Sequence, residues 1–221
     1  MDSPLELALR LSIGARYEWV QTQYSGNDDI DDLWRPLLQA VAAHDFAIGN
    51  RILELSPAVI PKPNDRASAA VFTGVYALMK RDGDLLQQAV DEASRRKPPA
   101  YLKSISLVLE AVAAGSTALF ATSINKMLSS YPGYMWRDDI YRLVDPHAIG
   151  IYELCRLYSP RAVGDFDTTR KLPWDREYHE WLQTCDDITV HFEKDRVPDE
   201  VRSLVVELQP LEWAAQVRKN W

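Results

Sequence analysis

The feature of this chain that most constrains its fold is a short apolar pattern that recurs about every 35 residues. Residues 37–43 read LLQAVAA, and residues 108–114 read VLEAVAA. A looser copy, VYALMK, lies midway between them at residues 75–80. Each copy is followed by a polar break and a second apolar run, at residues 46–55, 85–93 and 119–128. A repeating unit with two helical runs indicates stacked helical hairpins, which usually bind partners and rarely catalyse.

Helical patterns recur along most of the chain, residues 161–172 look irregular, and no segment shows a convincing apolar–polar alternation of a strand. We therefore expect an all-α fold of stacked antiparallel helical hairpins, similar to tetratricopeptide and α-solenoid scaffolds. It would form a single domain over residues 1–221 with an irregular C-terminal third. About ten helices are predicted, with the bounds 3–24, 31–44, 46–55, 65–80, 84–96, 100–114, 116–130, 145–158, 173–188 and 199–208.

The charge balance narrows the class of partner. The chain has 32 acidic and 25 basic residues, a formal net charge of −7 and a pI near 5.1. Nucleic-acid binding needs a basic face, so this balance argues against a nucleic-acid partner. It fits a protein partner with a basic surface, although an acidic soluble protein without such a partner would have the same composition.

The sequence also predicts where the chain resides. The N-terminus lacks the basic start and long apolar stretch of a signal peptide, and no run of about 18 apolar residues could span a membrane. The two cysteines, Cys155 and Cys185, fall in apolar helical patterns and imply no disulfide framework. We therefore expect a cytoplasmic protein that makes no membrane contact.

Patterns that would signal catalysis or a bound cofactor are missing from the sequence. None of the four histidines stands in an HExxH arrangement, and no CxxC, glycine-rich phosphate loop or GxSxG occurs. Cys155 and His147 would lie two helical turns apart, too far for direct contact. The acidic residues and the histidine between residues 175 and 186 do not fall on one helix face. We therefore predict no catalytic residue, no metal ligand and no cofactor.

The strongest local charge feature is an acidic segment at residues 28–32. Its acidic side chains are Asp28, Asp29, Asp31 and Asp32. We predict that the acidic segment docks a basic surface, which would speed association and make binding sensitive to salt. The alternative is that these carboxylates only favour the start of the next helix and keep the chain soluble. A two-carboxylate metal site would need residues 138–139 or 186–187 to face the segment.

Aromatic residues after the predicted helix 116–130 form a second candidate for partner contact. They are Tyr131, Tyr134, Trp136 and Tyr141. Aromatic side chains are common at interface hot spots, and we select Tyr134 and Trp136 as predicted contacts. The alternative is that the group packs a joint between repeats. Trp213 and Trp221, near the end of the chain, are candidates for a homodimer contact.

Several short motifs in the region 71–129 point to a known family. They are YALM at 76–79, GDLL at 83–86 and LEAVAAG at 109–115. An aspartate-opened helix at 145–154 and the segments 161–167 and 172–174 continue the likeness. On these motifs, about two thirds of the chain resembles the all-helical immunity proteins of bacterial polymorphic toxin systems, most closely the immunity protein 49 family. The chain departs from the family pattern at residues 115–117, where an acidic turn would be expected.

The resemblance implies that the chain binds and neutralises a cognate toxin made by the same bacterium, with no catalysis of its own. Inhibition would be steric, by covering the active site or the substrate groove of the toxin. Such toxins are often nucleases with a basic face, which the acidic balance of this chain would suit. The resemblance assigns no binding residue, because these interfaces vary with the toxin.

Two other functions remain open from the sequence. A helical-repeat adaptor would hold a peptide in a concave groove and would carry Asn, Lys or Arg at matching repeat positions. Asn50, Arg51 and Asn125 are scattered instead. A metal-dependent all-α enzyme would need two acidic clusters that converge. We favour the toxin-neutralising function over the adaptor, and the adaptor over the enzyme.

Overall fold

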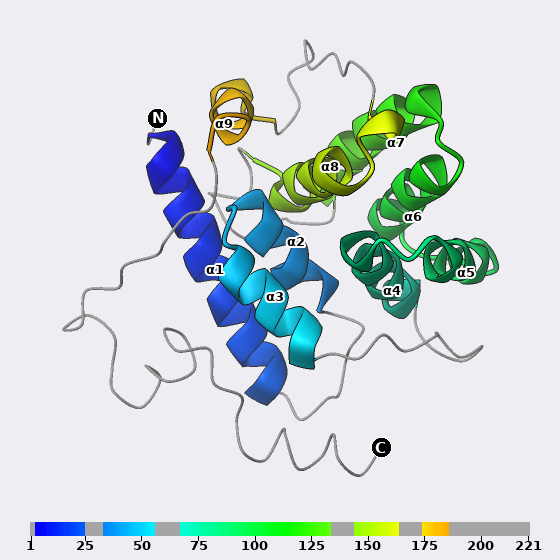
Figure 1. Ribbon diagram of the computed structural model, residues 1–221, viewed down its shortest axis with the longest axis horizontal. Coiled ribbons are helices and arrows are strands. Elements are labelled where there is room, and N and C mark those ends of the chain that lie inside the picture. The colour runs from blue at the N-terminus through cyan, green and yellow to red at the C-terminus, as the bar shows by residue number, and fades with distance from the viewer. Residues whose placement is uncertain (1–2, 25–32, 56–66, 134–143, 164–173, 186–221) are drawn as a thin grey trace.

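The chain folds into α-helices, as a computed structural model shows (Figure 1). The structure describes residues 3–24, 33–55, 67–133, 144–163 and 174–185, and no β-strand occurs among them. The α-helices are α1 (Pro4–Tyr24), α2 (Trp34–Ala42), α3 (Phe46–Leu55), α4 (Ala67–Lys80), α5 (Gly83–Ser94), α6 (Ala100–Ala113), α7 (Thr117–Ser130), α8 (Pro146–Tyr158) and α9 (Arg176–Leu182). The predicted all-α class is confirmed.

Each copy of the sequence repeat forms the first helix of a hairpin. The hairpins are α2–α3, α4–α5 and α6–α7, and the two helices of each pack together (Figure 1). The three first helices end in the same way. The central alanine of each repeat, Ala40, Ala77 or Ala111, accepts a 2.9 Å hydrogen bond from the backbone N–H five residues later. This bond is the Schellman closure of a helix C-terminus. The stacked hairpins predicted from the repeat are therefore confirmed.

The closure requires one residue with left-handed backbone geometry in each turn. These residues are His44, Arg81 and Gly115, with φ of 54°, 56° and 63°. Glycine adopts this geometry freely, whereas a side chain makes it unfavourable. The third hairpin therefore has the ordinary turn residue, and the first two retain a strained residue at the same position.

The residue after the left-handed position starts the second helix of each hairpin. Asp45, Asp82 and Ser116 each accept a hydrogen bond on a side-chain oxygen from the backbone N–H three residues later. This is the N-cap arrangement that satisfies a helix donor without a helical partner. Ser116 therefore does in the third hairpin what an aspartate does in the first two, although the sequence there lacks an acidic turn.

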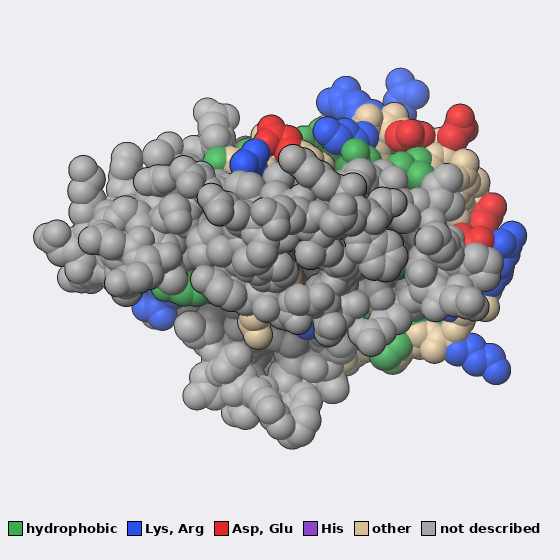
Figure 2. Space-filling view, turned by 90° about the horizontal axis from the view of Figure 1, so that it is seen from below, with side chains coloured by type: hydrophobic (Ala, Val, Ile, Leu, Met, Phe, Trp, Pro, Cys, Tyr) green, Lys and Arg blue, Asp and Glu red, His purple; other side chains and the backbone are tan. Residues whose placement is uncertain are grey.

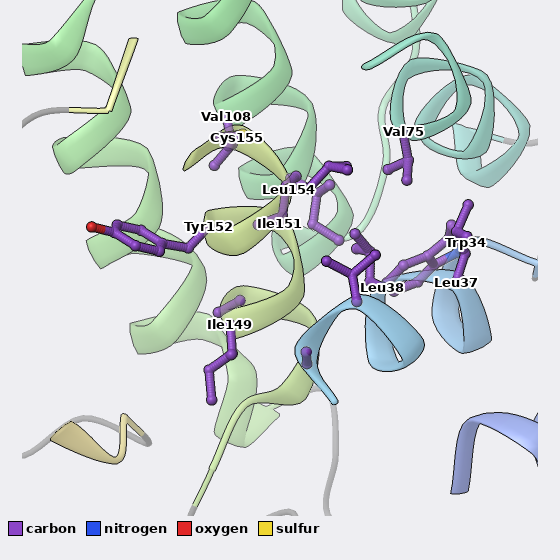
Figure 3. Close-up of a cluster of buried hydrophobic side chains, with 14 of the residues drawn as sticks. Trp34, Leu37, Leu38, Val75, Val108, Ile149, Ile151, Tyr152, Leu154 and Cys155 are labelled. Atoms are coloured by element: carbon purple, nitrogen blue, oxygen red, sulfur yellow. The ribbon is translucent and has the colours of Figure 1, made fainter. Parts of the chain in front are cut away.

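The helix that closes the stack comes from far along the chain. α8 packs against α2 over most of its length and also contacts α4 and α7. Every residue from Pro146 to Cys155 is buried. The helices approach most closely at Gly150, where an added β-carbon would lie 1.9 Å from the carbonyl oxygen of Leu38. Apolar side chains of α2, α4 and α8 meet in one cluster there (Figure 3).

This closure distinguishes the fold from an open solenoid. In an open solenoid each repeat contacts only its neighbours in the sequence. Here α8 lies against the first hairpin, and α9 contacts α1 at the start of the chain. The repeat predicted the hairpins, but it contains no copy at α8 and so gave no sign of this packing.

α1 packs on the first hairpin and buries a stripe of residues spaced four apart. Leu11, Ala15 and Trp19 are buried, and Leu7 is half-buried against the same core. The helix begins as expected, because the backbone N–H of Glu6 donates to the Ser3 hydroxyl at 3.3 Å. α1 contacts α2, α3 and α9 through this buried face.

Some helix bounds differ from the prediction. The helix expected at 173–188 is wrong in length, because α9 covers only Arg176–Leu182. The Asp175 side chain accepts a 2.9 Å hydrogen bond from the backbone N–H of Tyr178 and therefore sets the start of α9. α5 begins one residue earlier than expected, because the cap is Asp82. The helix predicted at 199–208 lies outside the described residues, as do residues 31–32 and 65 at two predicted helix starts.

The surface of the described helices is charged. Figure 2 shows Lys and Arg side chains next to Asp and Glu side chains on the part of one face that is described. Arg10 pairs with Glu6 at 2.7 Å and Arg95 with Glu92 at 2.7 Å. Such exposed pairs add little stability. No described helix combines the length and the apolar character needed to cross a bilayer.

Candidate functional site

The side chains predicted to contact a partner lie outside the described residues. They are Asp28, Asp29, Asp31 and Asp32 before α2, and Tyr134 and Trp136 after α7. Tyr131, from the same aromatic group, is described and is buried. Its ring packs on the ring of Tyr101, with 5.6 Å between the centroids. Tyr131 therefore packs inside the α6–α7 hairpin, and the predicted joint between repeats stays a prediction for the rest of the group.

Among the described residues, a mostly buried group of polar and charged side chains lies where α2, α8 and α9 meet. It consists of His44, Glu153, Arg156 and His179, and we call it the Glu153 cluster. Oε2 of Glu153 accepts from Nε and Nη2 of Arg156, at 2.8 and 2.7 Å. Nε2 of His44 lies 3.5 Å from the same oxygen, and Nδ1 of His179 lies 3.6 Å from Oε1. One buried carboxylate therefore links three elements.

The residues at the left-handed turn positions of the first two hairpins contact α8 through their side chains. His44 uses this position in the first hairpin to reach Glu153. In the second hairpin, Arg81 places its guanidinium 5.5 Å from the ring centroid of Tyr158, also on α8. Both strained residues thus contact the closing helix. Backbone strain of this kind persists only where surrounding contacts outweigh its cost in free energy. In these two turns, the contacts with α8 are such contacts.

The Glu153 cluster lies where α9 docks on the first hairpin. The Tyr178 hydroxyl donates to the Ala42 carbonyl at 2.6 Å. That carbonyl belongs to the last turn of α2, where helix carbonyls need outside partners. Nδ1 of His44 lies 3.1 Å from the Cys185 carbonyl, just after α9. Leu182 adds a fully buried side chain, so α9 is held by hydrogen bonds and by apolar contact.

The imidazole ring of His179 in α9 lies among aromatic rings. Its ring centroid lies 4.8 Å from that of Tyr152 and 5.1 Å from that of Trp174. Its side chain is only 14% exposed. Nε2 lies 3.1 Å from the amide nitrogen of Gln183, one turn further along α9. The imidazole is thus enclosed by two rings, an amide and the Glu153 carboxylate.

Burial and neighbouring charges shift the pKa of Glu153 in opposite directions. Burial is the largest effect on Glu153 and raises its pKa, but the nearby His44 and the hydrogen bond and charge of Arg156 outweigh it and leave the pKa below its usual value. The pKa of His179 is also lowered, first by burial and then by Arg156, against the raising effects of Glu153 and Glu180. Both directions favour an ionised Glu153 and a neutral His179 near pH 7.

Asp45, which follows His44 in the sequence, links the turn between α2 and α3 to α1. Oδ2 of Asp45 accepts from Nη2 and Nε of Arg16 at 2.7 and 2.9 Å, and also from the Ser12 hydroxyl. The Arg16 and Asp45 side chains are 5% and 1% exposed. Asp82, at the same position in the second hairpin, is exposed. The turn of the first hairpin is therefore the one on which α1, α8 and α9 converge.

A second buried polar cluster lies at the start of α8. Oδ1 of Asp145 accepts from the Tyr101 hydroxyl at 2.7 Å and from the backbone N–H groups of His147 and Ala148 at 3.1 and 3.0 Å. The Trp34 ring lies 5.0 Å from the ring of His147. Burial raises the pKa of Asp145 to about 7, and burial lowers the pKa of His147 to about 3. This group joins α2, α6 and α8.

The polar side chains of the two clusters are buried and contact neighbouring helices. His44, Asp145, His147 and Glu153 are each at most 2% exposed. Burial raises the pKa of the Cys155 thiol and so keeps it in the weakly nucleophilic protonated form. In the part of the chain that the structure describes, no three His, Cys, Asp or Glu side chains are placed to hold a metal ion.

The Glu153 cluster was not predicted from the sequence, although the chain contains two signals of it. Aligning the three repeats places His44 where the third repeat has Gly115, and a non-glycine residue at a left-handed turn position is uncommon. Glu153 interrupts an otherwise apolar run from Ala148 to Cys155, and buried Glu is rare unless it is paired. The first signal can be recognised only once the turn geometry is known, and the second only once the burial of Glu153 is known.

The chain matches no protein-family model, no curated protein and no solved structure in the comparisons. Its function is therefore inferred from its own residues and contacts.

Proposed function

We propose that this chain is an immunity protein that binds a toxin made by the same bacterium and neutralises it by steric cover. The observation that carries the proposal is how the described buried carboxylates are used. Asp45, Asp145 and Glu153 each join two or more helices of the hairpin stack. Buried polar contacts placed in this way would stiffen a scaffold, and a rigid scaffold is what a steric inhibitor needs. The sequence resemblance to the immunity protein 49 family supports the same role.

The proposed toxin has a basic surface. The net charge of −7 would attract such a surface and speed its association. We place the contact at the acidic segment, with Tyr134 and Trp136 as aromatic anchors. A nuclease is the class of toxin that fits best, because nucleases carry basic faces for their substrate. The proposed role needs no cofactor and no catalysis by this chain, and it would be carried out in the cytoplasm.

The toxin would bind an outer face of the hairpin stack. α8 fills the side of the stack formed by α2 and α4, and its residues from Pro146 to Cys155 are buried there. Opening that side would break the close contact between Gly150 and Leu38. A partner therefore finds the outer helices more readily than the surface under α8.

A helical-repeat adaptor is the alternative function. The three matching hairpin turns favour it, because repeated hairpins of this kind commonly bind peptides or proteins. A peptide held in the usual inner groove would have to displace α8, so this function requires a different surface. The adaptor and the immunity protein differ in the number and the nature of their partners.

Capture of the partner tests the proposal. The full chain, carrying an affinity tag, is expressed in the bacterium that encodes it, and captured proteins are identified by mass spectrometry. The proposal predicts one stoichiometric partner that is toxic when expressed alone and harmless with this chain. Several substoichiometric, non-toxic partners would favour the adaptor instead. If nothing is captured, a thermal-shift screen with divalent metals would test the enzyme alternative.

A further inference from the structure

His179 of α9 lies beside a carboxylate whose charge is already balanced. Glu153 and Arg156 of α8 already form a close ion pair at 2.7 Å, so their charges cancel. His44 faces the same carboxylate from the turn after α2, and Glu180 lies beside His179 on α9. A proton on His179 therefore adds positive charge to a mostly buried group in which Arg156 already balances the carboxylate.

The surroundings of His179 stabilise the neutral ring. The Tyr152 and Trp174 rings enclose it, and little of its side chain reaches water. The amide nitrogen of Gln183 lies 3.1 Å from Nε2, where it donates to the lone pair of a neutral imidazole. Protonation would fill that lone pair, and Gln183 would have to turn its amide to keep a hydrogen bond to the ring. A charged His179 would be better hydrated with α9 away from the rest of the protein.

We propose that α9 is an acid-weakened clasp: it docks on α2 and α8 while His179 is neutral, and its docking weakens when His179 takes up a proton. The clasp includes the contacts that hold α9, namely the Tyr178 hydroxyl on the Ala42 carbonyl and the Cys185 carbonyl near His44. Acid therefore acts on the attachment of the chain from Arg176 to Cys185. The inference does not depend on the identity of any partner.

The direction and the pH window follow from the shift at His179. Its pKa is lower in the folded chain than the ordinary value of 6.5, so docking is strongest above pH 6.5 and is lost as the pH falls from there toward the folded-state pKa. At pH 5.5 the docking equilibrium would fall by at most about tenfold. Glu153 has a pKa below its ordinary value of 4.5, so it stays ionised across this window.

Hydrogen exchange of the full chain tests the clasp. Protection of the backbone amides of α9 is measured by mass spectrometry at pH 7.5 and 5.5, corrected for the intrinsic exchange rate. The amides of α5 serve as an internal control, because α5 lies far from the cluster in the contact pattern. The matched variant is His179→Phe, which keeps a ring between Tyr152 and Trp174 but cannot take up a proton.

The clasp predicts a several-fold loss of α9 protection at pH 5.5 in the wild type, with no change in α5 and none in H179F. Unchanged wild-type protection, or an equal loss in H179F, would overturn it. If H179F already lacks protection at pH 7.5, the titration of His179 in the wild type decides the matter by NMR. A pKa at or above 6.5 would then overturn the clasp, and a lower pKa would support it.

Discussion

The carbonyl oxygen of Leu38 in α2 lies so close to Gly150 in α8 that a β-carbon on Gly150 would come within 1.9 Å of it. The carbonyl carbon and α-carbon of Leu38 would lie 2.7 and 3.0 Å away. Because these are backbone atoms, they cannot move aside as the end of a side chain can. The approach fixes the distance between the two helices at the centre of the core.

Gly150→Ala should therefore destabilise the protein strongly. The added methyl group forces α2 and α8 apart and disturbs the core around them, and we expect a loss of about 3 kcal/mol or more in the free energy of unfolding. Urea denaturation followed by circular dichroism measures this loss.

Gly49→Ala is the matched control. Gly49 lies inside α3, and an added β-carbon would meet only Leu37 and Met79 side-chain atoms at 4.0 Å. Alanine favours a helix interior over glycine, so G49A should gain about 0.5–1 kcal/mol. A G150A protein as stable as the wild type would show that α2 and α8 do not approach as described.

Asp45→Asn tests the buried ion pair with Arg16. Asparagine still caps α3 but removes the negative charge that Arg16 contacts at 2.7 Å, so we expect a loss of about 3 kcal/mol. Asp82→Asn changes the same turn position in the second hairpin, where the side chain is exposed, and should stay within about 0.5 kcal/mol. Thermal or urea unfolding of both variants compares them. Equal losses would mean that Asp45 acts only as a cap.

Asp145→Asn should change how stability depends on pH. Burial raises the pKa of Asp145 from 3.8 to about 7, so its contribution to stability is fully present below pH 3.8 and is lost as the pH rises through 7. D145N lacks this titration and keeps the capping oxygen. The stability of D145N relative to the wild type should therefore increase between about pH 4 and 7 and then level off.

Urea unfolding at several pH values measures this difference. The opposite contribution of His147, whose pKa is lowered to about 3, is present above pH 6.5 and is lost as the pH falls through 3. The wild type and D145N share this contribution of His147, so it cancels in the difference between their free energies of unfolding. A difference that stays flat across this range would show that Asp145 titrates near its ordinary value.

Charge reversal in the acidic segment should weaken partner binding without unfolding the chain. The variant replaces Asp28, Asp29, Asp31 and Asp32 with lysine. We expect at least about a tenfold loss of affinity for the captured partner, mostly in the association rate, and a smaller loss at high salt. Calorimetry and stopped-flow measure both quantities, and circular dichroism checks the helix content.

The matched control reverses exposed carboxylates on a different helix. Asp84 and Asp91 lie on the exposed face of α5, and D84K/D91K should bind nearly as the wild type does if the acidic segment is the contact. If the quadruple variant binds as well as the wild type, the acidic segment is not part of the interface.

Much of the fold could be predicted because its signals are local. The apolar periods gave the helices, and the repeat gave the three hairpins. Capping residues gave the starts of α1 and α8, where the caps are Ser3 and Asp145. The length of α9 was wrong because Trp174, which the helical spacing included, precedes the cap at Asp175.

The packing of α8 on α2 could not be predicted in this way. It joins segments more than 100 residues apart, and its one sequence sign is a glycine inside an apolar helix. The Glu153 cluster was missed for the same reason. His44, Glu153 and His179 lie on separate elements, and only the closed stack brings them together. The predicted contacts of the acidic segment, Tyr134 and Trp136 remain predictions.

The measurement that tests the proposed function most directly is neutralisation in cells. The captured partner is expressed from an inducible promoter, alone, with this chain, or with G150D. We expect G150D not to fold correctly, because it places a carboxylate at the close contact with Leu38. Growth that stops with the partner alone, resumes with the wild-type chain and fails with G150D is the predicted result. A partner that is harmless alone, or whose toxicity this chain does not relieve, would contradict the immunity function.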